Sequence, residues 1–166
     1  MDFYLSMLNL LELCDFSRDK ILRDVMSYIV SRGPATAYKI ANDLNYHFSQ
    51  VYRKVRRLEK YGLIERSNGH RGDLLASTVR GLIVCYYYNC ASQELILNKL
   101  RKNLNIDKEH LARFLDVYLE YAKGGAPIDE LPIMIFYALY KGTPQELLSP
   151  LLPSVIRYIK GNIISQ

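Results

Sequence analysis

The 166-residue chain has no tryptophan and only three cysteines, Cys14, Cys85 and Cys90. An odd number of cysteines with no Cys-x-x-Cys pair argues against a disulfide framework and against a zinc site. Cys85 and Cys90 are five residues apart. We expect both to pack as small apolar groups, because free cysteine is among the most buried residue types.

Long apolar runs are missing as well. No stretch reaches the roughly 18 apolar residues that a membrane span needs. The N-terminal apolar stretch begins with an acidic residue, Asp2, and lacks the basic region that opens a signal peptide. The sequence therefore predicts a cytoplasmic protein without membrane association.

No set of side chains suited to catalysis stands out. There is no evident Ser-His-Asp, Cys-His or paired-carboxylate arrangement, and the Lys123-Gly124-Gly125 stretch lacks the strand and the Lys-Ser/Thr end of a phosphate loop. Asp107 and His110 are three residues apart and would need further ligands to hold a metal, so we interpret them as a capping aspartate and a surface histidine. We expect no enzymatic activity, no metal and no cofactor.

The residues that are present indicate a globular protein with an uneven charge. About half are apolar (49%), 23% are charged, and the net charge is +5. Residues 49–71 hold seven basic side chains, opposed only by Glu59 and Glu65. Such a local excess is the footprint expected of a nucleic-acid site. The seven are Arg53, Lys54, Arg56, Arg57, Lys60, Arg66 and Arg71.

Apolar spacing predicts helices through most of the chain. The first covers residues 1–14, and the second follows a cap at Ser17 and ends at Gly33. A short helix from Thr36 ends near Asn45, and the next covers residues 49–61, with Ser49 as its cap and Gly62 closing it. Further helices are expected at 93–104, 108–123, 127–140, from Pro144, and over 154–163.

Two short segments between these helices have the alternation of strands. The sequence LIERS (63–67) and the sequence DLLASTV (73–79) are joined by NGHRG, which is rich in turn-forming residues. Two strands joined by a glycine-containing basic turn predict a β-hairpin.

Helical geometry separates a buried from an exposed side of the helix at 49–61. At 100° per residue, Val51, Val55 and Leu58 fall on one stripe, which we expect to be buried. The opposite face carries Ser49, Arg53, Arg56 and Lys60, flanked by Gln50, Arg57 and Tyr52. Arginine can bond both acceptors of guanine and glutamine can do the same for adenine, while the other cations suit phosphates. The alternative is a solvated helix face, but that face lacks the acidic partners that would stabilise it.

This stretch resembles the winged-helix regulators of the MarR and PadR type. The matching pattern is Leu58-Glu59-x-x-Gly62-Leu63-Ile64-x-Arg66, followed by a hairpin and by Thr78-x-x-Gly81. The resemblance covers roughly residues 20–88. It implies that Gln50, Tyr52 and Arg53 face bases, and that His70 and Arg71 in the wing reach the flanking minor groove or phosphates.

The predicted fold is therefore mainly α with a small β-hairpin wing, arranged as three parts. Residues 1–16 form an N-terminal helix that could dimerise, residues 17–90 a winged helix-turn-helix DNA-binding domain, and residues 91–166 a helical C-terminal bundle. The apolar segment at 132–140 is either the centre of that bundle or a subunit interface.

Two classes of function remain open from the sequence. The first is a transcriptional regulator that binds double-stranded DNA as a homodimer. The DNA-contacting residues would be Ser49, Gln50, Tyr52, Arg53, Arg56, Arg57, Lys60, His70 and Arg71. The second is a winged helix used for protein–protein assembly in transcription or replication machinery. The seven basic residues favour DNA. A role in RNA processing is not excluded, and the sequence identifies no effector.

Overall fold

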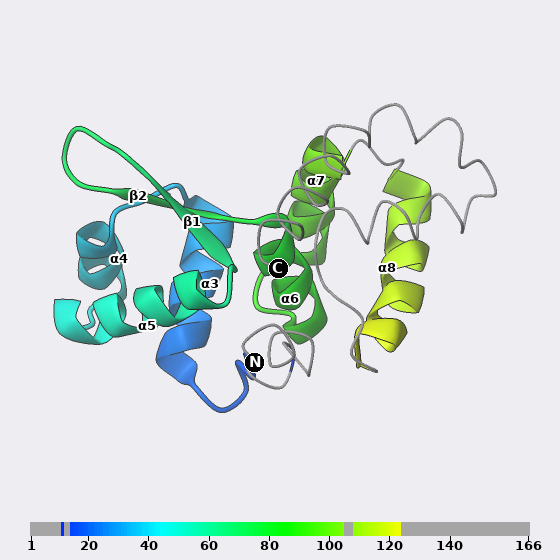
Figure 1. Ribbon diagram of the computed structural model, residues 1–166, viewed down its shortest axis with the longest axis horizontal. Coiled ribbons are helices and arrows are strands. Elements are labelled where there is room, and N and C mark those ends of the chain that lie inside the picture. Colours follow the sequence, from blue (N-terminus) through cyan, green and yellow to red (C-terminus); the bar gives the residue numbers. More distant parts are fainter. Residues whose placement is uncertain (1–10, 12–13, 105–107, 124–166) are drawn as a thin grey trace, which may run out of the picture.

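The computed structural model describes residues 11, 14–104 and 108–123. In order along the chain they form α3 (Lys20–Arg32), α4 (Ala37–Leu44), α5 (Phe48–Lys60), β1 (Ile64–Ser67), β2 (Leu74–Ser77), α6 (Val79–Tyr88), α7 (Gln93–Leu104) and α8 (Lys108–Lys123). The predicted fold class, helical with one small hairpin, is confirmed (Figure 1). The helices expected at 1–14 and beyond residue 126 lie outside the described residues.

Two helix starts differ from the sequence prediction. The predicted cap Ser17 is wrong, since Asp19 caps α3 by accepting a hydrogen bond from the Leu22 N–H at 3.0 Å. Ser17 instead donates its own N–H and hydroxyl to Asp15. Helix α5 begins at Phe48, so Ser49 is its second residue and not its cap. Serine and aspartate cap about equally well, and tertiary contacts of Asp19 decide between them.

The ends of α4, α5 and α6 share one geometry. Each is followed by a residue in the left-handed region, Asn45, Gly62 or Asn89, as the sequence predicted for the first two. The next N–H bonds back to a carbonyl five residues earlier, as from Leu63 to Leu58 at 3.0 Å. This is the Schellman ending, which satisfies the last helical carbonyls. At the ends of α5 and α6 it also brings two buried residues together.

At the end of α6 this geometry overturns the prediction for the cysteines. The N–H of Cys90 bonds to the carbonyl of Cys85 at 3.0 Å, and the two Cα atoms are 5.1 Å apart. Their sulfur atoms form a disulfide. Both residues are buried, as expected, but they are not free thiols. The Schellman ending places two residues that are five positions apart, here Cys85 and Cys90, next to each other. The number and spacing of the cysteines did not reveal this proximity. Cys14 is a buried free thiol, and burial raises its pKa to about 12.

The hairpin pairs β1 with β2 in antiparallel register, with Ile64 opposite Ser77 and Ser67 opposite Leu74. Ala35, just before α4, pairs with β2 as an isolated antiparallel bridge, because it exchanges backbone hydrogen bonds of 3.2 and 2.9 Å with Leu75. The base of the hairpin is thereby joined to the segment that leads into α4. The strand predicted for residues 73–79 ends earlier, at Ser77, because Thr78 caps α6.

The junction between α5 and α6 is tight. Thr78 Oγ1 accepts from the Gly81 N–H at 3.1 Å and donates to the Gly62 carbonyl at 2.6 Å. Arg80 donates to the Tyr61 carbonyl at 2.9 Å. A Cβ on Gly81 would stand 2.0 Å from the Leu63 carbonyl oxygen. Only glycine lets α6 approach this closely, which accounts physically for the Thr78-x-x-Gly81 pattern.

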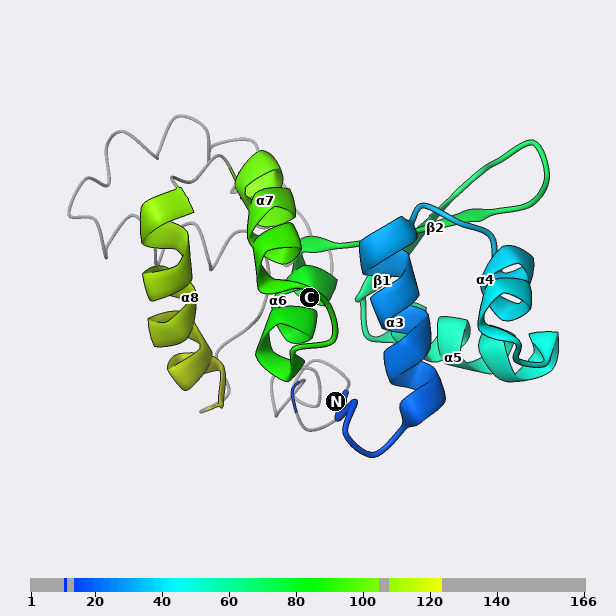
Figure 2. The same cartoon turned by 180° about the vertical axis from the view of Figure 1, so that it is seen from behind.

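One continuous core runs through the described residues. It joins the buried faces of α3, α5 and the hairpin to those of α6, α7 and α8. Figure 2 shows α6 between the helix-turn-helix on one side and α7 and α8 on the other. Two tyrosine–carboxylate bonds tie α3 to α4 and its following turn, from Tyr28 to Asp43 at 2.5 Å and from Tyr46 to Asp24 at 2.6 Å.

Candidate nucleic-acid interface

Helices α4 and α5, joined by a short turn, form the helix-turn-helix. The stripe predicted to be buried on α5 is confirmed, because Val51, Val55 and Leu58 are all at most 1% exposed. This stripe packs toward α3 and α4, which α5 contacts most extensively among the helices. The opposite side of α5 is consequently turned outward.

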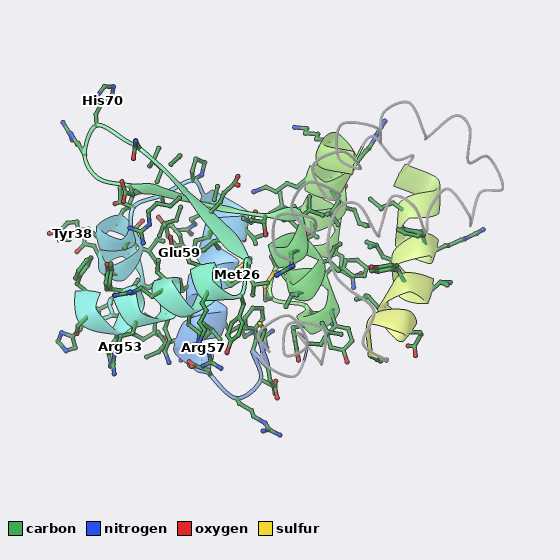
Figure 3. The ribbon with its side chains drawn as sticks, viewed as in Figure 1. Met26, Tyr38, Arg53, Arg57, Glu59 and His70 are labelled. Carbon is green, nitrogen blue, oxygen red and sulfur yellow. A yellow bond between two sulfur atoms is a disulfide. The ribbon has the colours of Figure 1, made fainter. Side chains whose placement is uncertain are left out.

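That outward side carries cations that form no ion pair with the residues the structure describes. Ser49, Arg53, Arg56 and Lys60 are all exposed, as the helical geometry predicted. Within residues 14–104 and 108–123, none of the side chains of Arg53, Arg56 and Lys60 makes an ion pair within 4.0 Å. Figure 3 shows Arg53 pointing away from the body of the domain. Three cations thus project from one helix face.

Two other basic residues of α5 are used inside the molecule. Lys54 Nζ lies 2.6 Å from Asp19 Oδ2 and Arg57 Nη1 lies 3.5 Å from the same oxygen. Partial burial raises the pKa of Asp19, but bonds from Lys54 and the Leu22 N–H, with the charges of Lys54 and Arg57, lower it by more. The net pKa of Asp19 is below its usual range. Arg57 is therefore partly committed to α3 and is a weaker candidate for DNA than its position on the helical wheel suggested.

Arg66 is held by two carboxylates inside the domain. Its guanidinium donates to both oxygens of Glu59, at 2.7 and 2.8 Å, and to Asp73 at 3.0 Å. The hydrogen bond from Arg66 lowers the pKa of Glu59. This cluster ties the hairpin to α5. The charge count for residues 49–71 missed Asp19 and Asp73 because both lie outside that range. With these two carboxylates included, four of the seven cations remain without a described ion pair: Arg53, Arg56, Lys60 and Arg71.

Gln50 has a local role that the sequence prediction did not include. Its Oε1 accepts a hydrogen bond from the His47 N–H at 3.3 Å, and its side chain is half-buried. A glutamine at the third helical position commonly bonds back in this way to the cap residue. Base contact by Gln50 would have to break or share that bond.

Exposed aromatic rings surround the start of α5. Phe48 is 49% exposed and Tyr52 is 37% exposed, and their rings stack with centroids 5.7 Å apart. Tyr38 on α4 is 71% exposed and points outward in Figure 3. Sequence analysis named Tyr52 but missed Phe48 and Tyr38. Phe48 and Tyr52 are four residues apart and lie, on the helical wheel, between the buried stripe and the outward basic face. Two large rings at that spacing were a readable signal for the pair.

The hairpin tip holds the predicted wing residues. His70 and Arg71 are both exposed, next to Gly72 with its φ of 115°. In Figure 3, His70 at the tip and Arg53 on α5 lie at opposite edges of the domain, so the structure does not bring the two groups together. A ligand that touched both would have to be long.

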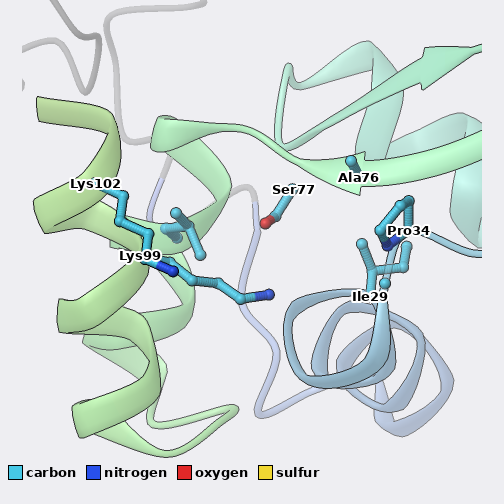
Figure 4. Close-up of a pocket in the computed structure, with 8 residues that line it drawn as sticks. Ile29, Pro34, Ala76, Ser77, Lys99 and Lys102 are labelled. Atoms are coloured by element: carbon cyan, nitrogen blue, oxygen red, sulfur yellow. The ribbon is translucent and has the colours of Figure 1, made fainter.

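A cleft of about 200 Å³ lies between α3, β2 and α7 (Figure 4). Its lining includes Pro34, Ser77, Lys99 and Lys102. Lys99 reaches across and donates to the Val30 carbonyl in the last turn of α3. Burial, together with the charge of Lys102, lowers the pKa of Lys99. Lys99 therefore serves to tie α7 to the C-terminal end of α3, where a cation is favourable.

Two weaker candidate sites from the sequence include residues outside the described ones. The Gly124-Gly125 pair and Asp107 are outside the described residues, so neither the rejected phosphate loop nor the Asp107–His110 pair is tested.

Within the described residues, no helix is both long and apolar enough to span a bilayer.

Comparison with known proteins adds a family likeness for this region. Residues 23–93 match the family described as sugar-specific transcriptional regulator TrmB. The matched part runs from within α3 to the first residue of α7 and so includes α4, α5, the hairpin and α6. The comparisons do not confirm the MarR or PadR type. No curated protein matches the chain.

Among solved structures, one that is similar in sequence is a transcriptional regulator. It is the crystal structure of a transcriptional regulator from Thermotoga maritima, with 28% identity over 68% of this chain and 79% of that chain. The TM-score is 0.40.

Proposed function

We propose that this protein is a transcriptional regulator that binds double-stranded DNA through α5. The observation that carries the proposal is the outward face of α5, where Arg53, Arg56 and Lys60 make no ion pair with any described residue. A purely structural helix face gains from acidic neighbours, whereas an unneutralised row of cations suits phosphates and base acceptors. The match of residues 23–93 to a transcriptional regulator family supports the same function.

Within this proposal the residues divide by role. Arg53 lies in the N-terminal half of α5, the half that enters the major groove in helix-turn-helix proteins, and would read bases. Arg56 and Lys60 would hold phosphates, with Ser49 beside them. Tyr52 flanks Arg53, and Gln50 contributes only if its bond to His47 is released. His70 and Arg71 in the wing would reach the flanking backbone or minor groove. Arg57 would contribute less, because its charge is partly neutralised by Asp19.

We propose further that the protein acts as a homodimer. Helix-turn-helix regulators bind two half-sites about one helical turn apart, which requires two recognition helices roughly 34 Å apart. The N-terminal segment together with the C-terminal helices would supply the interface. Val117 on α8, an exposed apolar residue within the described residues, is compatible with a contact on that side.

The test is a gel shift with genomic and random DNA at two or more salt concentrations. With about three to four phosphates neutralised per protomer, log affinity should fall with log salt with a slope of about −3 per protomer. This expectation counts only the cations that are not paired internally. Binding without salt dependence, or no binding at all, would contradict this proposal and favour the alternative function, a winged helix used for protein–protein assembly.

A further inference from the structure

Phe48 and Tyr52 form an apolar ridge with no structural task among the described residues. The buried stripe of α5 is complete without them, since Val51, Val55 and Leu58 fill the core. The two rings stack at 26° to one another and leave about half of Phe48 and over a third of Tyr52 exposed. Tyr52 makes no hydrogen bond with any residue that the structure describes. Large apolar groups exposed together commonly mark a binding surface.

The position of this ridge restricts what it can bind. Phe48 is the first residue of α5, and Tyr52 directly precedes Arg53. The same helix carries Arg56 and Lys60, which form no ion pair with any described residue. A partner must therefore offer negative charge and an apolar group side by side. In the major groove the four base pairs present hydrogen-bonding groups and one apolar group, the C5-methyl of thymine.

We propose that the Phe48–Tyr52 ridge reads the C5-methyl groups of thymines next to the base pair contacted by Arg53. This inference rests on the proposed function of DNA binding. The five helical steps from Phe48 to Arg53 span about 7.5 Å along the helix axis, which corresponds to about two base pairs of duplex. The preferred half-site accordingly contains a guanine with thymines within about two base pairs of it.

The experiment compares thymine with deoxyuracil, which differs only by the methyl group. A preferred site is first selected from a random duplex pool with the full-length protein. Each thymine in the site is then replaced singly by deoxyuracil, and affinities are measured at constant salt. Replacement at the positions beside the Arg53 contact should weaken binding about fourfold, the factor that burial of one methyl-sized group brings. Replacement elsewhere in the site should have no effect.

Variants assign the effect to the ridge. Phe48→Ala and Tyr52→Ala should bind the thymine and deoxyuracil sites equally, whereas Phe48→Leu, which keeps an apolar side chain, should retain part of the discrimination. Tyr38→Ala removes a ring on α4 that is even more exposed and should leave the thymine-to-deoxyuracil ratio unchanged. Melting curves check that each variant folds.

The possible failures are distinct. Salt-dependent DNA binding with no difference between thymine and deoxyuracil would overturn the ridge inference and leave the proposed function standing. Discrimination that survives in both alanine variants would also overturn it. Absence of DNA binding by the unmodified protein would overturn the inference and the proposed function together.

Discussion

Arg53 and Lys60 face the same way from α5 but differ in their distance from its N-terminus. Arg53 is the sixth residue of the helix and Lys60 is the last. Since base contacts come from the N-terminal half of a recognition helix, Arg53→Ala should cost about 1–3 kcal/mol on a specific site and much less on random DNA. Lys60→Ala should weaken binding to both DNAs by a similar factor and reduce the salt slope by roughly one.

Titrations on a selected site and on its scrambled version measure both effects. Neither side chain packs in the core, so melting temperatures should stay unchanged and serve as the control. An equal loss on both DNAs for Arg53→Ala would show that Arg53 holds phosphate, and the orientation of α5 in the groove would then be wrong.

Gly81 is the residue where a single methyl group should matter most for stability. Its Cβ would meet the Leu63 carbonyl oxygen at 2.0 Å and Met26 Cε at 2.8 Å. The methionine end can move, but the backbone carbonyl can move only by shifting β1 or α6. We expect Gly81→Ala to lower the free energy of unfolding by about 1–3 kcal/mol or more. Urea denaturation monitored by circular dichroism measures this loss, and a change within about 0.5 kcal/mol, typical of surface substitutions, would contradict the packing described.

At the scale of elements, polar ties hold α3, α4, α5 and the hairpin in their relative positions. Asp19 illustrates how one residue serves two of them, because it caps α3 with one oxygen and pairs with Lys54 and Arg57 of α5 with the other. The Glu59–Arg66–Asp73 cluster does the same between α5 and the hairpin. These ties hold the recognition helix in place.

Asp19→Asn separates the two roles of that residue. Asparagine still caps a helix, but it carries no charge for Lys54 and Arg57. We expect a loss of about 1 kcal/mol or less at neutral pH, as for partly exposed ion pairs. Asp19→Ala, which loses the cap as well, should be less stable than Asp19→Asn by about 1 kcal/mol. Equal stability of the two variants would mean that the cap contributes nothing.

The pH dependence of stability follows from the same carboxylates. The folded-state pKa of Asp19 and of Glu59 lies below the ordinary value, so the protonated unfolded state is favoured in acid. Their contribution to stability is therefore present above the unfolded pKa of about 4 and is lost as the pH falls through the lower folded value. Unfolding midpoints measured between pH 7 and pH 3 should fall less steeply for Asp19→Asn than for the unmodified protein. Parallel curves would show that Asp19 has the same pKa in both states.

At the scale of the whole molecule, the arrangement of two recognition helices decides whether a palindromic site can be read. We expect light scattering at tens of micromolar to give the mass of a dimer, with and without DNA. The reason is that a single α5 reads too few base pairs for a two-fold operator, which needs two helices about one turn of DNA apart. A monomer under both conditions would contradict the proposed dimer but not DNA binding itself.

Much of the helix-turn-helix could be predicted because its signals are local. The 3.6-residue spacing of Val51, Val55 and Leu58 determines which side of α5 is buried, whatever the rest of the chain does. The same holds for the helix end at Asn45 and for the hairpin turn. By contrast, the choice of Asp19 over Ser17 as a cap was beyond local rules, since both are good caps and only the contacts of Asp19 with α5 distinguish them.

The sequence by itself determined the order of the elements, the buried stripe of α5 and the basic character of its outer face, because periodicity and composition act over neighbouring residues. Only the tertiary structure decided which cations pair with carboxylates. Asp19 neutralises part of the charge of Lys54, which is 35 residues away, and Asp73 part of the charge of Arg66, which is 7 residues away. It also decided that Cys85 and Cys90 are bonded and that a methyl group on Gly81 would collide with the Leu63 carbonyl oxygen. Charge pairing, disulfide geometry and close packing depend on distances in space, and those exist only once the helices have packed.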